Sequence, residues 1–369
     1  MPQLFTELGL SAQTAYAQLL DASLGAEHAR SVADLPGSFN AKTVKGRLYW
    51  YFQYTEPSGK LRQVYVGPDG EAVQRLMQRK TEANVSAALQ PLARSALALG
   101  CAGILPRHFR VVRRLADYGL FRAGGVLVGT HAFLAFGNML GVKWSTMERT
   151  QDIDLAHPGK SIALVLPGDD EARVDDAITS LEMGFLPVTG LGGAAGATYL
   201  IPKEPEFRLD FLTTLHRGGD RPFPHPRLGI PLQPLPFMEF SLEGIEQTVL
   251  FCPEGAVLVN VPDPARFALH KLLVHAERKG TFRAKSNKDL AQSAHLLDYL
   301  WMHRRAQLGE VVVDLLGRGA GWVNRFRQGV EALRRVYPAL EVAGALVEAV
   351  ESGAARGGRR ANREGTPPS

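Results

Sequence analysis

The sequence predicts an α+β fold in which a small mixed sheet is flanked by helices. Short apolar and β-branched runs alternate with helical patterns from about residue 125 to residue 212, which is typical of a sheet packed against helices. Beyond Pro262 the strand patterns stop and only helical ones follow. Near the N-terminus, a helical segment precedes two aromatic strand patterns. We therefore expect an N-terminal helix and β-hairpin module, a core with the mixed sheet, and a helical C-terminal domain.

Length and composition fit several folded units. A chain of 369 residues with 45% hydrophobic and 21% charged residues can bury a sizeable core, which excludes wholesale disorder. We expect an N-terminal module over 1–105, a core over 106–260 and a helical domain over 261–350. Residues 351–369 are rich in Gly, Ala and Arg, with no apolar residue larger than Ala. They are expected to form a disordered basic tail.

The N-terminal elements are a helix, a hairpin and further helices. A helical pattern covers 11–24, with Ser11 as a candidate N-cap. Strand patterns at 47–54 and 61–66 are joined by a segment with Pro-Ser-Gly, which indicates a β-hairpin. Its aromatic residues either stack on nucleic-acid bases or dock on a neighbouring helix. One or two helices are expected between residues 69 and 99, and an amphipathic basic helix follows Pro106.

The core and the C-terminal part continue these patterns. We predict a buried strand at 125–128 that breaks at Gly129 into a helix over 130–140. Further strands are expected at 152–155, 162–166, 197–201 and 207–212, with a helix at 169–183. C-terminal helices are expected at 264–279, 287–303, 307–316 and 330–350, the last broken at Pro338.

The segment from Ala123 to Val142 has no charged residue over twenty positions, the length of a membrane span. Its five glycines and His131 favour a buried strand, turn and helix instead. The two cysteines form no disulfide framework or metal-ligand motif, and the N-terminus shows no secretory signal. We therefore expect a cytoplasmic protein without a membrane partner.

Three aspartates mark the candidate site. Because side chains alternate along a strand, Asp152 and Asp154 lie on one face while Ile153 points to the core. Two like charges side by side are costly unless a cation lies between them. Asp210, between Leu209 and Phe211, repeats the pattern in a later strand. Three such carboxylates would suit a magnesium site for phosphoryl transfer.

A glycine turn precedes these carboxylates. At Gly129 and Thr130 the strand passes into a helix, whose first amides can bind an anion. The order of this turn, Asp152 and Asp154, and then Asp210 resembles the polymerase-beta-like nucleotidyltransferase superfamily. The chain also looks like a bacterial branch of that fold with a YWYFQY and VYVGP segment in front, here Tyr49–Tyr54 and Val64–Pro68. The fold implied is a nucleotidyltransferase-type mixed sheet.

The resemblance also implies a reaction and residue roles. Asp152, Asp154 and Asp210 would be the catalytic residues and would hold Mg²⁺ (or Mn²⁺), while an acceptor hydroxyl attacks the α-phosphorus of an NTP such as ATP and expels pyrophosphate. The helical part resembles toxin-type nucleotidyltransferases through Phe267–Arg278 and Lys288-Asp289-Leu290. On this basis Gly129, Thr130, Lys271 and Asp289 would bind the nucleotide.

A local excess of positive charge agrees with this hypothesis. The segment from His270 to Lys288 holds six basic residues and one acidic residue, which would form a positive rim for a polyanionic substrate. His131 and His270 are interpreted as core histidines. The acceptor stays open between an RNA 3′ end, a protein side chain and a small molecule.

Two other functions are compatible with the residues. A sugar-nucleotide glycosyltransferase also uses Asp-x-Asp for a divalent ion. In such an enzyme about a hundred residues of alternating strands and helices are expected before the motif, whereas here that region is mostly helix with one hairpin. A catalytically silent member of the fold would act as a nucleic-acid or protein-binding module through the hairpin and the basic helices. The presence of all three carboxylates favours the nucleotidyltransferase.

Overall fold

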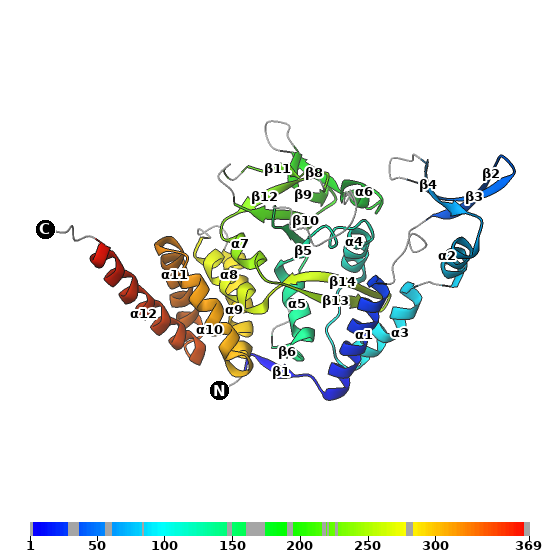
Figure 1. Cartoon of the computed structure of the whole chain (residues 1–369). Coiled ribbons are helices and arrows are strands. Elements are labelled where there is room, and N and C mark those ends of the chain that lie inside the picture. Colours follow the sequence, from blue (N-terminus) through cyan, green and yellow to red (C-terminus); the bar gives the residue numbers. More distant parts are fainter. Residues whose placement is uncertain are drawn as a thin grey trace.

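A computed structural model describes residues 3–28, 37–55, 61–82, 85–145, 150–159, 174–189, 195–215, 219, 221–225, 228–277 and 283–364. Helices and strands alternate through the middle of the chain, and the C-terminal part is helical (Figure 1). The α+β prediction is therefore confirmed.

The largest sheet has seven strands. Its order is β11-β12-β10-β7-β5, with β9 also paired to β10 and β8 paired to β9. The central strand β10 is parallel to β7 and β12 and antiparallel to β9, so the sheet is mixed as expected. The strands are β5 (Val126–Leu127), β7 (Asp152–His157), β8 (Leu186–Thr189), β9 (Ala195–Ile201), β10 (Glu204–Thr214), β11 (Phe223–His225) and β12 (Ile230–Leu235).

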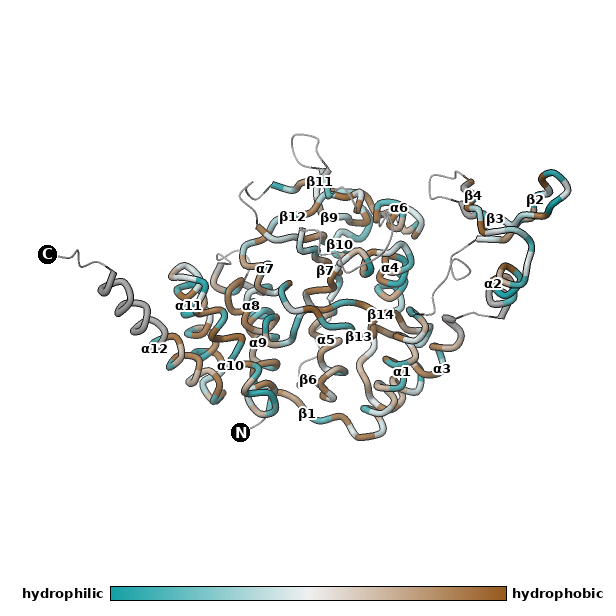
Figure 2. The backbone as a smooth tube through the Cα atoms, in the orientation of Figure 1, coloured by the Kyte–Doolittle hydropathy of each residue, from teal (hydrophilic) through white to brown (hydrophobic). Residues whose placement is uncertain are grey.

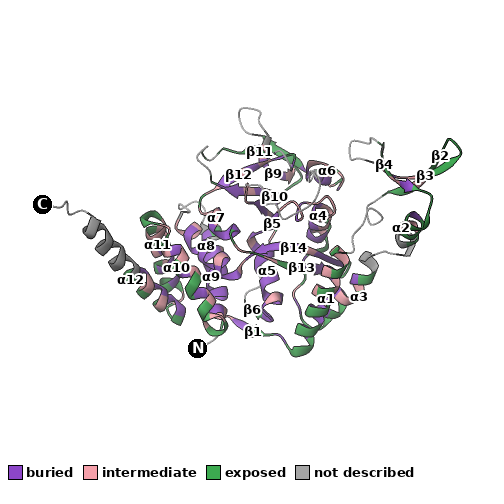
Figure 3. Cartoon of the chain, viewed as in Figure 1, coloured by how far each residue is buried: buried purple, intermediate pink, exposed green. Residues whose placement is uncertain are grey.

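The main core lies between this sheet and the helices. Over residues 152–155 of β7 and 207–211 of β10, buried apolar residues alternate with half-buried polar ones, as a sheet with one covered face requires. Helix α5 (Gly129–Met139) is hydrophobic over most of its surface and is largely buried, as Figures 2 and 3 show. This burial explains why an uncharged stretch of membrane-span length occurs here. No helix in the described ranges is long and apolar enough to cross a membrane.

Segments far apart in the sequence share the second hydrophobic cluster. Helices α1 (Leu10–His28) and α3 (Val85–Ala98) pack on the hairpin of β13 (Ile245–Cys252) and β14 (Gly255–Pro262). Strand β1 (Phe5–Glu7) likewise pairs with β6 (Val142–Trp144). Parts of the predicted module at 1–105 thus contribute to the packing of later elements, and the predicted domain boundaries stay a prediction.

The hairpin near the N-terminus is part of a three-stranded sheet. The predicted pair is β3 (Arg47–Thr55) and β4 (Leu61–Pro68), and β2 (Ser38–Val44) extends it on the other side of β3. Helix α2 (Glu71–Glu82) follows. We call these four elements the β2–β4 module; Figure 1 shows it standing to one side of the core.

Helices α8 to α12 form the C-terminal part, with α4 and the short α6 and α7 beside the sheet. Their bounds are α4 (Pro106–Asp117), α6 (Val174–Thr179), α7 (Met238–Leu242), α8 (Pro264–Glu277), α9 (Arg283–His303), α10 (Arg305–Leu316), α11 (Ala320–Val336) and α12 (Glu341–Glu364). The last helix differs from the expected disordered tail. Because Ala, Arg and Glu are strong helix formers, residues 351–364 continue α12, whereas 365–369 lie outside the described residues.

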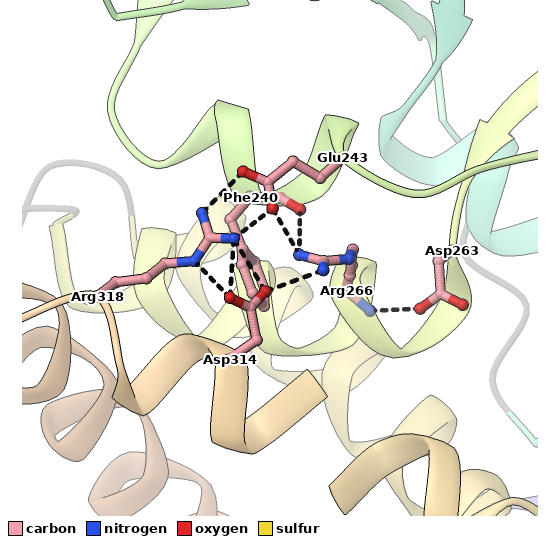
Figure 4. Close-up of polar contacts among 6 residues, drawn as sticks. All are labelled: Phe240, Glu243, Asp263, Arg266, Asp314 and Arg318. Atoms are coloured by element: carbon pink, nitrogen blue, oxygen red, sulfur yellow. Dashed lines mark hydrogen bonds and ion pairs between the residues drawn. The ribbon is translucent and has the colours of Figure 1, made fainter. Parts of the chain in front are cut away.

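An ion-pair network joins α7, α8 and α10. Arg266 contacts Glu243 at 3.0 Å and Asp314 at 2.9 Å, and Arg318 binds the same two carboxylates (Figure 4). Both guanidinium groups also lie over the ring of Phe240, at 5.0 and 4.9 Å from its centroid. The network ties the helical part to the segment that leaves the main sheet.

Some local predictions need correction, and others lie partly or wholly outside the described residues. Ser11 lies inside α1 and is not its N-cap, because the first helical hydrogen bonds run to the carbonyl of Gly9. The helix expected at 169–183 is described only as α6 over residues 174–179. The strand expected at 162–166 lies outside the described residues. The hairpin of β13 and β14 was missed because its mostly apolar strands have no clear alternation.

Candidate active site

The first feature of the site is a pair of facing carboxylates. Strands β7 and β10 are parallel, and their register places Asp154 directly opposite Asp210 and Asp152 opposite Arg208. Neighbouring strands lie about 4.8 Å apart, so these side chains emerge close together from one face. Asp210 is fixed from the other side, because Oγ1 of Thr198 on β9 donates to its Oδ1 at 2.6 Å.

The glycine turn closes over this pair. Gly129 has a φ of +64°, and a Cβ placed there would lie 2.0 Å from Oδ2 of Asp154. The amide of Val128 donates to the backbone carbonyl of Asp154 at 2.9 Å, which holds the turn against β7. Only a glycine allows this approach. The first backbone amides of α5 therefore lie beside the carboxylate of Asp154. In this arrangement the amides can bind an anion while the neighbouring carboxylate binds a cation.

The charge on Asp154 is costly in this position. Burial, reinforced by the neighbouring carboxylate of Asp210, raises the pKa of Asp154 to about 6, although Lys271 and Lys285 oppose the rise. Such a shift is typical of a carboxylate that lacks enough compensating positive charge. Carboxylate oxygens are the ligands that Mg²⁺ prefers. Asp154 and Asp210 therefore fit a divalent cation by chemistry and by position.

Asp152 has a different environment. Its carboxylate pairs with Nε of Arg208 at 3.3 Å and with Nζ of Lys285 at 3.6 Å. Within the described ranges, no group of three or more His, Cys, Asp or Glu side chains is arranged to hold a metal ion. The structure thus brings Asp154 and Asp210 together, and it places Asp152 on the same face but in contact with basic side chains.

The predicted nucleotide-binding lysine lies in a buried ion pair. Nζ of Lys271 on α8 donates to Oδ1 of Asp289 on α9 at 2.7 Å, and both side chains are largely buried. Its positive charge also lowers the pKa of Asp154, as does that of Lys285. Part of the basic segment at 270–288 therefore faces the carboxylates. Arg278 and Lys279 lie outside the described residues.

A buried polar cluster supports the turn from behind. Nε2 of Gln292 donates to Oγ1 of Thr130 at 3.2 Å, so this hydroxyl faces the protein interior. Next to it, Nδ1 of His108 and Nε2 of His131 share a hydrogen bond of 3.0 Å. Burial lowers the pKa of His108 to about 4 and of His131 to about 3, with further contributions from Arg107 and His108 respectively. Both imidazoles are neutral at pH 7, and they position the turn rather than supply charge.

Sequence reasoning missed several partners of the carboxylates. Arg208 lies two positions before Asp210 on β10, so strand alternation already places both on one face. Thr198 lay within a predicted strand, but only the register of β9 with β10 reveals its bond to Asp210. His108 was included in a basic helix without a role. His131 and His270, predicted as core histidines, are both buried.

Comparison with known proteins places this site in a family. Residues 107–316 match the model of a family described as nucleotidyltransferase. This span includes Gly129, Asp154, Asp210 and Lys271 and leaves out the β2–β4 module. A comparison with the curated proteins finds no match.

Among solved structures, the chain is similar to an antigenic nucleotidyltransferase-like protein from Paracoccidioides brasiliensis. The two sequences are 14% identical, the comparison covers 67% of this chain and 95% of that chain, and the TM-score is 0.31. A similarity with this score shows neither the fold nor the function of the chain.

Proposed function

We propose that this chain, which belongs to the nucleotidyltransferase family, transfers a nucleoside monophosphate from an NTP to an acceptor hydroxyl and releases pyrophosphate. In this reaction the acceptor oxygen forms a bond to the α-phosphorus, the bond from that phosphorus to the pyrophosphate oxygen breaks, and the hydroxyl proton leaves to a base. The observation that carries the proposal is the placement of Asp154 opposite Asp210 and against the turn at Gly129.

Magnesium, or manganese, is the proposed cofactor. Asp154 and Asp210 would hold it, and Asp152 would join them if substrate phosphates drew Arg208 and Lys285 away. When bound, the ion would neutralise charge on the phosphates and on the leaving pyrophosphate. The raised pKa of Asp154 supports this assignment, because a bound cation would offset the effects of burial and of the Asp210 charge that raise it.

The chain's own residues would position the two substrates. Backbone amides at Gly129 and Thr130 would bind phosphate oxygens at the start of α5. Lys285, whose side chain is half exposed, is free to turn toward a triphosphate, whereas Lys271 is held by Asp289 and would act at a fixed point. Asp210, with Oδ1 held by Thr198, would orient the acceptor hydroxyl and accept its proton.

The arrangement before Asp152 separates this proposal from a glycosyltransferase. In a glycosyltransferase, alternating strands and helices are expected ahead of the acidic motif. The described residues before β7 instead hold the β2–β4 module, further helices, and the short strands β1, β5 and β6. We therefore favour nucleotidyl transfer.

The test uses α-labelled NTPs with Mg²⁺ or Mn²⁺, and total RNA or cell lysate as the source of acceptors. We expect label transfer by the wild-type chain and its loss in Asp154→Asn and Asp210→Asn. The matched control is Asp21→Asn, because Asp21 is exposed on α1. Transfer that persists in both site variants would refute the assigned site. Absence of transfer with every nucleotide and acceptor would instead favour a silent binding module.

A further inference from the structure

The β2–β4 module has one face that the rest of the described chain leaves uncovered. Register places Lys42 of β2 opposite Tyr49 of β3, and Tyr51 of β3 opposite Tyr65 of β4. Directly opposed residues in antiparallel strands share a face, and Arg47 lies on it too. We call the side chains of Lys42, Arg47, Tyr49, Tyr51 and Tyr65 the tyrosine face.

The opposite side of this sheet is the one that packs. Phe52 is fully buried there, with the ring of Phe39 at 5.2 Å, and Val73 of α2 is buried as well. The sequence alone left two roles open for the aromatic residues of the hairpin, base stacking and docking on a helix. The alternation of β3 now places these residues on two different faces of the sheet. Phe52 packs against the module's own interior, while the three tyrosines lie outside it.

The tyrosine face holds one exposed ring, that of Tyr65, and the half-buried rings of Tyr49 and Tyr51. Tyr65 is 54% exposed, and its ring neighbours are Tyr51 at 5.5 Å and Tyr49 at 6.2 Å. Figure 3 shows this part of the molecule mostly in the colour of exposed residues, and Figure 1 shows it away from the core. A group of partly exposed rings on a small sheet is a stacking platform for flat ligands.

Charge on the tyrosine face is positive. Nζ of Lys42 lies 4.8 Å from the ring centre of Tyr51 and donates to Oε1 of Gln63. Arg47 is exposed beside Tyr49. The three strands place no acidic residue on this side, and Ser38–Pro68 holds five basic residues and one acidic residue. Figure 2 shows a hydrophilic tip at the turn between β2 and β3.

We propose that the tyrosine face binds a single-stranded nucleic acid. Unpaired bases offer flat surfaces to the tyrosine rings, and the phosphates between them meet Lys42 and Arg47. A duplex hides its base faces in its own stack, so it cannot use the rings. A face with cations and no carboxylate also favours a polyanion over the mixed charges of a protein surface. This binding goes beyond nucleotidyl transfer and needs neither NTP nor metal.

The test measures fluorescence anisotropy of a labelled single-stranded RNA of about 12 nucleotides, within the site sizes of single-strand binders, with the full-length chain in EDTA and without NTP. We expect Tyr65→Leu to weaken binding about fivefold or more, because it removes a stacking surface. Tyr65→Phe keeps the ring and should bind like wild type. Since Tyr65 is exposed, neither change disturbs the buried side of the sheet, and thermal unfolding checks this.

Charge is tested separately. Lys42→Gln combined with Arg47→Gln should reduce the slope of log Kd against log salt by about 1.4, or about 0.7 for each phosphate that is no longer neutralised. Lys143→Gln, a change of an exposed lysine on β6, is the matched control. The proposal is overturned if no RNA binds, if Tyr65→Leu binds as tightly as wild type, or if a duplex of the same sequence competes equally well. These outcomes leave the transfer assay, and thus the proposed enzyme activity, unaffected.

Discussion

At residue 129 the chain combines a positive φ with a lack of space for any side chain. A methyl group there would meet Oδ2 of Asp154, and alanine is also strained at a φ of +64°. We predict that Gly129→Ala lowers transfer activity on the order of 100-fold, because small displacements of catalytic groups have large effects on rate. Initial rates of label transfer would measure this. Gly309→Ala is the control, since open space surrounds Gly309 within α10; equal rates for both variants would contradict the prediction.

Asp154 illustrates a conflict between stability and function. Because folding raises its pKa to about 6, the native state binds more protons than the unfolded state between about pH 4 and pH 6. Stability should therefore fall as the pH rises through this range. Without divalent cations at pH 8, we predict that Asp154→Asn raises the free energy of unfolding by on the order of 2 kcal/mol, while it abolishes transfer.

Urea unfolding at pH 8 and at pH 4 would test this sign. The increase in stability should shrink toward pH 4, where the native carboxyl is protonated, and added Mg²⁺ should stabilise the wild type alone. Asp21→Asn, at an exposed position, should change little at either pH. A site variant less stable than wild type at pH 8 would show that the charge of Asp154 is already compensated.

The direction of a single side chain can be predicted where residues alternate between the two faces of a strand. The shared face of Asp152, Asp154 and Asp210 follows from the two strand patterns alone, and the structure has them there. The ion pairs of Asp152 do not follow, because Lys285 comes from a helix about 130 residues later. Local patterns give the direction of a side chain, while its partner depends on tertiary packing.

At the scale of elements, the ion-pair network in Figure 4 connects α7, α8 and α10. Although burial acts to raise the pKa of Asp314, hydrogen bonds and charge from Arg318 and Arg266 hold it below its usual value. A lowered carboxyl pKa means stability that is present above the unfolded pKa and is lost as the pH falls through the folded one. We predict that Asp314→Asn lowers the free energy of unfolding by about 0.5–1 kcal/mol at pH 7, because solvent screens a carboxylate whose side chain is 36% exposed.

Below about pH 4 the difference between this variant and wild type should narrow progressively, because the carboxyl of Asp314 becomes protonated first in the unfolded state and then, at lower pH, in the folded state. Chemical unfolding from pH 7 to pH 3 would measure it. Asp117→Asn is the matched control, since its ion pair with Arg113 spans 3.7 Å and lies on a single helix. A constant difference across this pH range would mean that Asp314 acts through shape rather than charge.

Some elements lacked a sufficient sequence signal. Strand β2 is joined to β3 by Lys45 and Gly46, both with positive φ, as in a tight hairpin turn. Lysine is an unusual first residue for such a turn, so the pair gave no prediction. By contrast, α2 and α3 lie in the range where one or two helices were expected, although Pro91 inside α3 normally argues against a helix. The amphipathic helix α4 and the long helix α9 were predicted closely, because their helical patterns extend over several turns.

At the scale of the whole molecule, the order of elements was more predictable than their packing. The packing of α1 and α3 on β13 brings together segments far apart in the chain, and no local pattern encodes such a contact. The net charge of +5 likewise does not tell where the basic residues lie in the fold. In the structure, Lys271 and Lys285 lie near the carboxylates, while Lys42 and Arg47 lie on the separate tyrosine face.

This separation predicts unequal local stability. In the described part of residues 38–82, the buried apolar side chains are Phe52 and Val73, whereas β7 and β10 bury several residues almost completely. Since buried apolar area limits the free energy of local opening, backbone amides of β3 should exchange with deuterium at least about tenfold faster than those of β10. Hydrogen exchange followed by mass spectrometry would resolve the two regions in one experiment.

The same experiment tests whether the two proposed sites are separate. Single-stranded RNA should slow hydrogen exchange in β2, β3 and β4 but not in β10. NTP with Mg²⁺ should do the reverse, because its proposed site lies on β7, β10 and the start of α5. Protection of both regions by either ligand alone would show that they form one site.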